Sequence, residues 1–559
     1  MQSRFVLLGL AVVFTAGIAS AAKTRVFTGG IVQAAGGPRR AAVVIRGNRI
    51  AAVVAPDQAK SWIGPGTEVI HLQGAHVLPG LIDAHLHLTG YGMALERVDL
   101  RGSRSWSEVV RRAQDQALRH PGGGWLEGRG WDQNLWHDSK FPDRKELDTK
   151  FAVRPVFLRR IDGHAAVANG AALKLAGIDR KTPDPEGGRI IRRSDGEPSG
   201  LLIDGAVDLV ERVIPRPSDR DVEQAILRAS HALLRMGLTQ VGDAGTTARE
   251  LEVLRRLARD KRLPIRVYVL LDGSDDALLD RELAKGPDFR SVAMLRVGGV
   301  KLYADGALGS RGALLGADYS DDPGNRGIAV TSRARLRKVI REATTAGFQV
   351  AVHAIGDEAV HRVLNLYDEV GPALCRRLRH RIEHAQTVRP GDVGRFSTLG
   401  VIASVQPVQC TSDMSWAPNR LGPVRITWAY RWRSFEKAGV RLAGGSDAPV
   451  ESPDPRFGLF AAVTRERPDG TPQGGWYAGE RLTRSQALAL FTAGAAYAAH
   501  AERWCGMIRA GMVADLTIVD RDPLQVSPNA LLDIKVLRTI VDGEDRWVAR
   551  DGKAAGEAE

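Results

Sequence analysis

Residues 335–357 read RLRKVIREATTAGFQVAVHAIGD, and this stretch indicates the fold. Apolar residues recur three and four positions apart in its first half, which is typical of an amphipathic helix. A glycine then separates the helix from a near-continuous apolar run that ends at His353. Such a run is typical of a strand that is buried on both faces, as in a parallel sheet. The stretch therefore predicts one helix-and-strand unit of an α/β fold.

The same unit recurs along the middle of the chain. A helical pattern followed by an apolar strand occupies residues 222–245, 250–273, 396–407 and 432–449, in addition to 335–357. Further strands are expected within residues 75–88, 295–306 and 379–386, which makes eight in chain order. Eight parallel strands covered by helices predict a closed (β/α)8 barrel of the TIM type.

The two ends of the chain have a different texture. Residues 24–80 contain short β-rich runs separated by Gly and Pro, and residues 514–523 and 536–553 resemble them. We therefore expect a small β-sandwich domain built from residues 22–78 and 501–559. The barrel would occupy residues 79–500.

A long segment separates the first two predicted barrel strands. Residues of about 90–220 are rich in Trp, Arg and Gly, and the segment is too long for a loop. We expect an inserted subdomain that leaves the barrel from the strand ends where active sites lie. It is a candidate lid or substrate wall.

The N-terminus has the features of an export signal. Arg4 gives a positive start, residues 5–17 are apolar, and Ala19-Ser20-Ala21 is a small-residue cleavage site. The apolar run is short for a membrane-spanning helix. We expect a signal peptide over residues 1–21, an exported mature protein in the periplasm or medium, and no stable membrane anchor after cleavage. The alternative is an uncleaved anchor.

Composition narrows the remaining choices. The formal charge is +13, but the arginines are scattered among acids, so we expect a solvated basic surface and no nucleic-acid partner. Only Cys375, Cys410 and Cys505 are present, so the core and not disulfides must stabilise the chain. The sequence is compatible with either a monomer or a homo-oligomer.

Candidate metal ligands follow the predicted strands. His85 and His87 stand two positions apart, so their side chains share one face of a strand. His353, His384 and Asp447 each end a separate apolar run. Any one of them is as well explained by a structural hydrogen bond, but four strand ends that agree favour one shared metal site. Imidazole and carboxylate suit zinc.

Several further residues are candidates for catalysis or substrate binding, each with a structural alternative. Asp447 could act as general base, and His164 in the insert could donate to a developing oxyanion. Arg311 could bind a substrate carboxylate, although a structural ion pair explains it equally well. The other candidates for the pocket wall are Trp131, Asp305 and Gln406.

The ordered motifs resemble those of one known family. The strings VKLYADGALGSRGA (300–313), HAIGD (353–357), RIEHA (381–385) and SDAPV (446–450), with RIDGHAAVAN (160–169), resemble the amidohydrolase superfamily, in particular its family 3, YtcJ-like branch. The resemblance covers nearly the whole mature chain. It implies a metal-dependent (β/α)8 hydrolase with a β-sandwich formed by both termini. Known activities of the branch act on C–N bonds, including those of N-substituted formamides.

The resemblance also implies roles for individual residues. His85 and His87 match the first metal pair, His353 and His384 the later histidines, and Asp447 the aspartate after the last strand. Lys301 falls where many members carry a carboxylated lysine that bridges two metals, and the alternative is an unmodified lysine. One or two divalent ions, most simply zinc, are therefore expected.

These observations predict an enzyme that uses metal-activated water to cleave an amide-type C–N bond, such as an N-acyl or N-formyl bond, of a small molecule. An ester, lactone or carbamate hydrolase on the same scaffold is the first alternative. A non-catalytic exported binding protein is the second.

Overall fold

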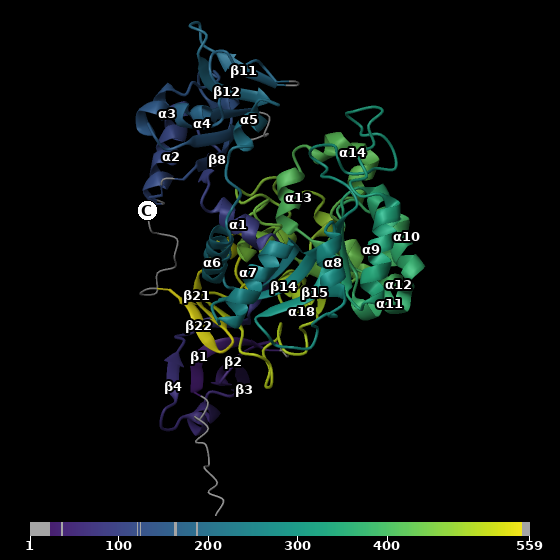
Figure 1. Ribbon diagram of the computed structural model, residues 1–559. Coiled ribbons are helices and arrows are strands. Elements are labelled where there is room, and N and C mark those ends of the chain that lie inside the picture. The colour runs from purple at the N-terminus through teal and green to yellow at the C-terminus, as the bar shows by residue number, and fades with distance from the viewer. Residues whose placement is uncertain are drawn as a thin grey trace, which may run out of the picture.

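The computed structural model describes residues 23–34, 37–119, 121–122, 124–160, 165–185 and 188–549. Its central unit is an eight-stranded parallel sheet that curves into a barrel (Figure 1). The strands are β6 (Leu81–Leu86), β13 (Leu238–Thr246), β14 (Arg266–Asp272), β15 (Leu295–Tyr303), β16 (Gln349–Ala354), β17 (Arg381–His384), β18 (Ile402–Val405) and β19 (Leu442–Gly444).

The first and last strands meet through the segment that follows β19. The backbone N–H of Asp447 donates to the carbonyl of His85 at 2.7 Å, and that of His87 donates to Ala448 at 2.9 Å. The backbone N–H of Ser446 also donates to the carboxylate of Asp83. These bonds close the barrel at the carboxyl ends of its strands.

Helix α9 shows how the sequence sets the helix boundaries. Its N-terminus is capped by Ser332, whose hydroxyl accepts from the backbone N–H of Arg335. Its end is followed by Gly347 at φ +84°, a conformation that glycine adopts without steric cost, and the chain then enters β16. The helices of the barrel unit are α1 (Leu88–Ala94), α6 (Asp219–Arg235), α7 (Ala248–Arg259), α8 (Asp276–Leu283), α9 (Arg333–Thr345), α10 (Asp357–Val370), α11 (Pro372–Leu378), α12 (Pro390–Leu399), α13 (Pro407–Asp413), α14 (Ala417–Arg425), α15 (Trp432–Lys437), α16 (Pro455–Thr464), α17 (Arg484–Leu490) and α18 (Ala493–Ala498).

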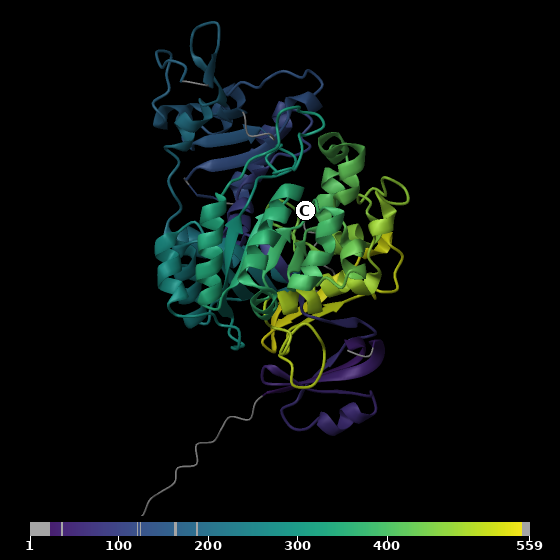
Figure 2. The same cartoon turned by 90° about the vertical axis from the view of Figure 1, so that its right-hand side faces the viewer.

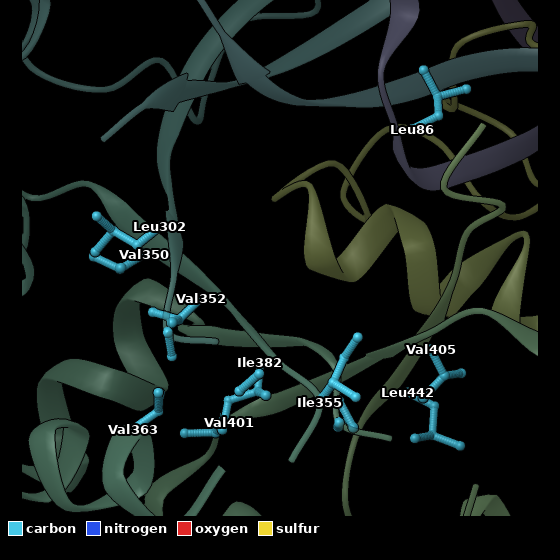
Figure 3. Packing of buried hydrophobic residues seen from close by; sticks show 14 of the residues in the cluster. Leu86, Leu302, Val350, Val352, Ile355, Val363, Ile382, Val401, Val405 and Leu442 are labelled. Carbon is cyan, nitrogen blue, oxygen red and sulfur yellow. The ribbon is translucent and has the colours of Figure 1, made fainter. Parts of the chain in front are cut away.

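Alternate strand residues pack outward against these helices. Leu302, Val352, Ile382 and Val405 belong to the largest apolar cluster, together with Val363 of α10 (Figure 3). Residues at the intervening positions point to the barrel interior because successive strand side chains face opposite sides. The outward face is therefore the main apolar core, and the inward face is free to carry polar groups.

The two chain ends form one further sheet, at the bottom of Figure 1. They meet where β5 pairs antiparallel with β20, with Val77 opposite Ile518. Hydrogen bonds connect all of their strands into a single sheet. The strands are β1 (Thr24–Ala34), β2 (Gly37–Arg46), β3 (Arg49–Val54), β4 (Glu68–His71), β5 (His76–Pro79), β20 (Leu516–Val519), β21 (Val536–Val541) and β22 (Glu544–Val548).

The segment between β6 and β13 forms a separate six-stranded sheet with its own helices, at the opposite end of the molecule (Figures 1 and 2). Its core includes Val109 of α2 and Leu158 of β9. The strands are β7 (Val98–Asp99), β8 (Leu126–Trp131), β9 (Val156–Arg160), β10 (Ala165–Ala168), β11 (Gly188–Arg192) and β12 (Pro198–Asp204). The helices are α2 (Trp106–Arg119), α3 (Lys145–Lys150), α4 (Gly170–Leu175) and α5 (Val207–Glu211).

This architecture confirms the predicted fold class of a TIM-type barrel with a β-rich unit from both ends. The three cysteines are free and buried. The predicted signal peptide, residues 1–21, lies outside the described residues. In the part of the chain that the structure describes, we find no helix with the length and apolar character needed to span a bilayer.

Candidate metal centre

The carboxyl ends of the barrel strands bring the predicted ligands together. Tyr303 of β15 pairs with His353 of β16, and Ala354 pairs with His384 of β17, so these residues lie at one level. Asp447 reaches the same place because its backbone is bonded to His85. The parallel arrangement of the strands thus gathers residues that are hundreds of positions apart in sequence.

His85, His384 and Asp447 form the tightest group. One ligand atom from each lies within 4.8 Å of the other two, and all three residues are buried. Nε2 of His85 is 3.5 Å from Oδ1 of Asp447, and Nε2 of His87 is 3.3 Å from the same oxygen. The ring of His353 lies 4.5 Å from that of His384, measured between centroids. All four predicted histidines therefore border one point.

Burial sets the charge of these side chains. It lowers the pKa of His85 to about 3, and the pKa values of His353 and His384 are also lowered, chiefly by desolvation. Burial opposes ionisation of Asp447, but hydrogen bonding to His87 and the other nearby histidines outweigh it and lower its pKa. Neutral imidazoles beside a carboxylate are the donor set that suits a divalent metal such as zinc, so the residues fit the group.

Lys301 is fully buried beside this group. Its Nζ lies 3.2 Å from Nε2 of His85 and 4.6 Å from the centre of the Tyr303 ring. Burial lowers its pKa to about 8. The lowered pKa increases the neutral fraction of the Lys301 amine, and carboxylation requires the neutral amine. The position of Lys301 is therefore compatible with the metal-bridging role that the family resemblance implies.

Two polar residues that the sequence interpretation missed hold the ligands in place. Glu383 contacts Nδ1 of His85 at 2.5 Å through Oε2. Gln409 contacts Nδ1 of His384 at 3.2 Å through its carbonyl oxygen, and its amide donates to Oδ2 of Asp447 at 3.0 Å. The sequence does carry a signal for Glu383, because two charged residues, Arg381 and Glu383, stand two positions apart on a short, otherwise apolar strand. Nothing in the sequence marks Gln409.

A cavity of about 370 Å³ opens beside the ligands. Its wall combines apolar residues, among them Leu308 and Trp416, with the carboxyl groups of Asp413 and Glu451. In the described part of the chain, no arginine lines it. The lining residues are His87, Lys301, Tyr303, Ala307, Leu308, Gly309, His353, Ile355, His384, Gln386, Gln409, Asp413, Trp416, Asp447, Val450 and Glu451.

The insert borders a second cavity next to this one. It measures about 570 Å³ and is lined by Arg97 and Arg101 of the insert and by Glu451, which also lines the ligand cavity. The two cavities therefore share a wall. This placement is compatible with the insert as part of the substrate entrance.

The structure does not bring the four predicted substrate-binding residues into the ligand cavity. Trp131 is fully buried in the insert core, where its indole N–H donates to Leu158. Arg311 pairs with Asp321, and Gln406 is buried with its amide donating to Ser404. None of them lines the cavity, because each side chain is engaged within its own unit.

Asp305 is buried behind the ligands and is also absent from the cavity wall. Its carboxylate accepts from the backbone N–H groups of Leu314, Ile355 and Gly356, and Oδ1 lies 3.6 Å from Nε2 of His353. Its hydrogen bonds therefore hold the backbone of two loops, beside His353, and do not place it to bind substrate. His164 lies outside the described residues, so its predicted role stays a prediction.

The comparisons agree with this geometry. The sequence model of the amidohydrolase family matches residues 68–545. The chain belongs to this family. The chain is 34% identical to the putative amidohydrolase YtcJ of Bacillus subtilis over 516 residues. This aligned region covers 91% of this chain and 96% of the relative.

Two further proteins that are similar to this chain add chemistry and structure. An N-substituted formamide deformylase of Arthrobacter pascens is 30% identical over 527 residues, covering 90% of this chain and 94% of the relative. A metal-dependent hydrolase of Pyrococcus horikoshii, solved by crystallography, has a TM-score of 0.75 at 31% identity and covers 90% of this chain and 99% of its own. The protein is accordingly a hydrolase of the amidohydrolase family with a candidate His/His/Asp metal site and a small-molecule substrate.

Proposed function

We propose that this hydrolase cleaves an amide-type C–N bond, of the N-acyl or N-formyl kind, in a small molecule. The convergence of His85, His384 and Asp447 beside the cavity, which His384 and Asp447 line, is the observation that carries the proposal. The formamide deformylase relative supports the choice of bond.

The residues that would hold one or two divalent ions, zinc being the best fit to the donors, are His85, His87, Lys301, His353, His384 and Asp447. Such ions would polarise the substrate carbonyl and lower the pKa of a water molecule. Gln409 binds Oδ2 of Asp447, which leaves Oδ1 on the side of the histidines. Asp447 then accepts the proton of the attacking water and returns it to the leaving nitrogen.

The cavity wall favours substrates of a particular charge. Burial raises the pKa of Asp413 to about 7 and also raises the pKa of Glu451, so these groups would repel a substrate carboxylate or phosphate at alkaline pH, where they are ionised. The described wall offers no arginine to bind such a group. Leu308 and Trp416 provide apolar surface for the group attached to nitrogen. We therefore expect neutral or amine-bearing N-substituted amides to be better substrates than acidic ones. This replaces the anion-binding role predicted for Arg311.

Two measurements test the function. Elemental analysis of the purified mature protein should find zinc or another transition metal at one or two atoms per chain. A panel of N-formyl and N-acyl amines with matching esters should give the highest kcat/KM for an amide. Faster cleavage of the esters would favour the ester, lactone or carbamate alternative, and a metal-free protein with unchanged activity would reject the mechanism.

We also propose that the protein is exported, on the basis of the signal-like sequence at residues 1–21. N-terminal sequencing of protein from the native host should begin directly after Ala21. A mature protein that begins at Met1 would contradict export by cleavage.

A further inference from the structure

The barrel interior directly behind the ligands is ionic. Arg381 and Glu383 of β17 point inward, and their side chains are 1% and 0% exposed. Interiors of TIM-type barrels are usually filled by bulky apolar side chains. A buried ion pair is often no more stabilising than apolar residues of similar volume, so stability alone gives a weak reason for this one.

The pair is geometrically well defined. Nε of Arg381 donates to Oε1 of Glu383 at 2.7 Å, and Nη2 donates to Oε2 at 2.8 Å. The same Nη2 donates to the carbonyl of Ala84 in β6 and to Oγ of Ser404 in β18. Arg381 thus ties Glu383 to the neighbouring strand β18 and, across the barrel interior, to β6, and it leaves the carboxylate little freedom to move.

The carboxylate then meets the metal-ligand candidate His85. Oε2 of Glu383 lies 2.5 Å from Nδ1 of this fully buried ring. Because a carboxylate only accepts, Nδ1 must carry the proton, and the lone pair of the neutral ring is on Nε2. Nε2 faces the candidate centre, 3.5 Å from Oδ1 of Asp447 and 3.2 Å from Nζ of Lys301.

We propose that Glu383, held by Arg381, is a positioning residue that fixes the tautomer and direction of His85 so that Nε2 binds the metal. The inference rests on the proposed metal-dependent function. Carboxylate partners of metal-binding histidines raise ligand basicity, and their loss typically weakens metal binding about 10- to 100-fold.

The test compares this pair with a second buried pair that lies away from the ligands. Arg266 donates to Asp515 at 2.6 Å, and both side chains are at most 3% exposed. The double variant R381M/E383L removes the first pair, and R266M/D515L removes the second. Both replace ions by apolar groups, which folds commonly tolerate. E383Q is a third variant, because it keeps an acceptor for Nδ1 without the negative charge.

Zinc dissociation constants are measured on each folded apoprotein by competition with a chelator, and Co²⁺ absorption spectra report the ligand geometry. R381M/E383L should bind zinc about 100-fold more weakly with an altered Co²⁺ spectrum, E383Q about 10-fold more weakly, and R266M/D515L like the wild type. If R381M/E383L does not fold, the zinc affinity of E383Q is compared with that of the control R266M/D515L instead.

Two results would overturn the positioning role: wild-type zinc affinity in E383Q and R381M/E383L, or an equal loss in R266M/D515L. Wild-type protein that takes up no metal would instead reject the proposed function itself, so the two failures are distinguishable.

Discussion

The same kind of buried ion pair, between an arginine and a carboxylate, occurs in two regions of the barrel with different roles. Arg381 pairs with Glu383, and Arg266 pairs with Asp515. Arg381 and Arg266 each begin a barrel strand, and each is held by a carboxylate in the protein interior. Arg381 lies near the ligands, because its strand partner Ala351 pairs in turn with Lys301. Arg266 lies six residues before Asp272, the strand partner of Lys301, at the amino end of β14.

Their surroundings differ accordingly. Glu383 passes the constraint to His85, a candidate metal ligand. Asp515 belongs to the C-terminal part of the chain and precedes β20, so its bond to Arg266 joins the barrel to the terminal sheet. The comparison indicates that the carboxyl ends of the strands serve chemistry and the amino ends serve assembly. Variants at the two ends should therefore change different quantities.

The largest effect is expected at the chemical end. Asp447→Asn removes the group that would accept and return the proton, so kcat should fall by about 10²- to 10⁴-fold. Thermal unfolding should stay close to wild type, because Asn keeps the shape of Asp and one side-chain oxygen. This oxygen is a weaker metal ligand than the carboxylate, so kcat is compared at saturating zinc, with the zinc content of both proteins measured. Steady-state kinetics on the best amide substrate measure this, and turnover within a factor of two of wild type would contradict the role.

The matched change at the assembly end should affect stability instead. Among the described residues, Asp515→Asn leaves Asp542 as the one ionic partner of the buried Arg266. Breaking a buried pair costs about 3–5 kcal/mol of unfolding free energy. Denaturant unfolding measures the loss, and kcat of the remaining folded enzyme should be unchanged. A loss of kcat with unchanged unfolding would reverse the comparison.

A smaller effect is expected from Gln409, which bridges two ligands. Gln409→Leu removes the contact with His384 and the bond to Asp447, so zinc affinity should fall about 10-fold. Gln406→Leu, three positions earlier and outside the cavity wall, is the control. Equal zinc affinity in wild type and Gln409→Leu would show that these ligands hold their geometry without the amide.

A pH-dependent effect on stability is expected from His380, which lies outside the ligand group. Its Nδ1 accepts from the backbone N–H of Val350, its Nε2 contacts Oγ1 of Thr344, and burial lowers its pKa to about 3. Below the ordinary histidine pKa of 6.5 only the unfolded chain takes up this proton. The unfolding free energy should therefore fall as pH drops from about 6.5 towards 3, by at most about 1.4 kcal/mol per pH unit.

Denaturant unfolding at several pH values measures this slope. His380→Gln should be less stable near pH 7 and should lose less stability on acidification. An identical slope in wild type and variant would exclude His380 as its source.

The sequence by itself determined the barrel and the approximate place of its ligands. Apolar runs separated by amphipathic helices predict parallel strands, and parallel strands must end at one face. His353, His384 and Asp447 could therefore be placed together from pattern alone, and the family resemblance added Lys301. The i and i+2 spacing of His85 and His87 predicted a shared direction for the same local reason.

Only the tertiary structure decided which polar residues support the ligands and which never reach them. Trp131 and Arg311 looked suitable by type, but their orientation depends on packing within units that the sequence does not place. Glu383 with His85 and Arg266 with Asp515 are 298 and 249 positions apart. Local propensity carries no information over such separations, because contacts of this kind arise only when the whole barrel closes.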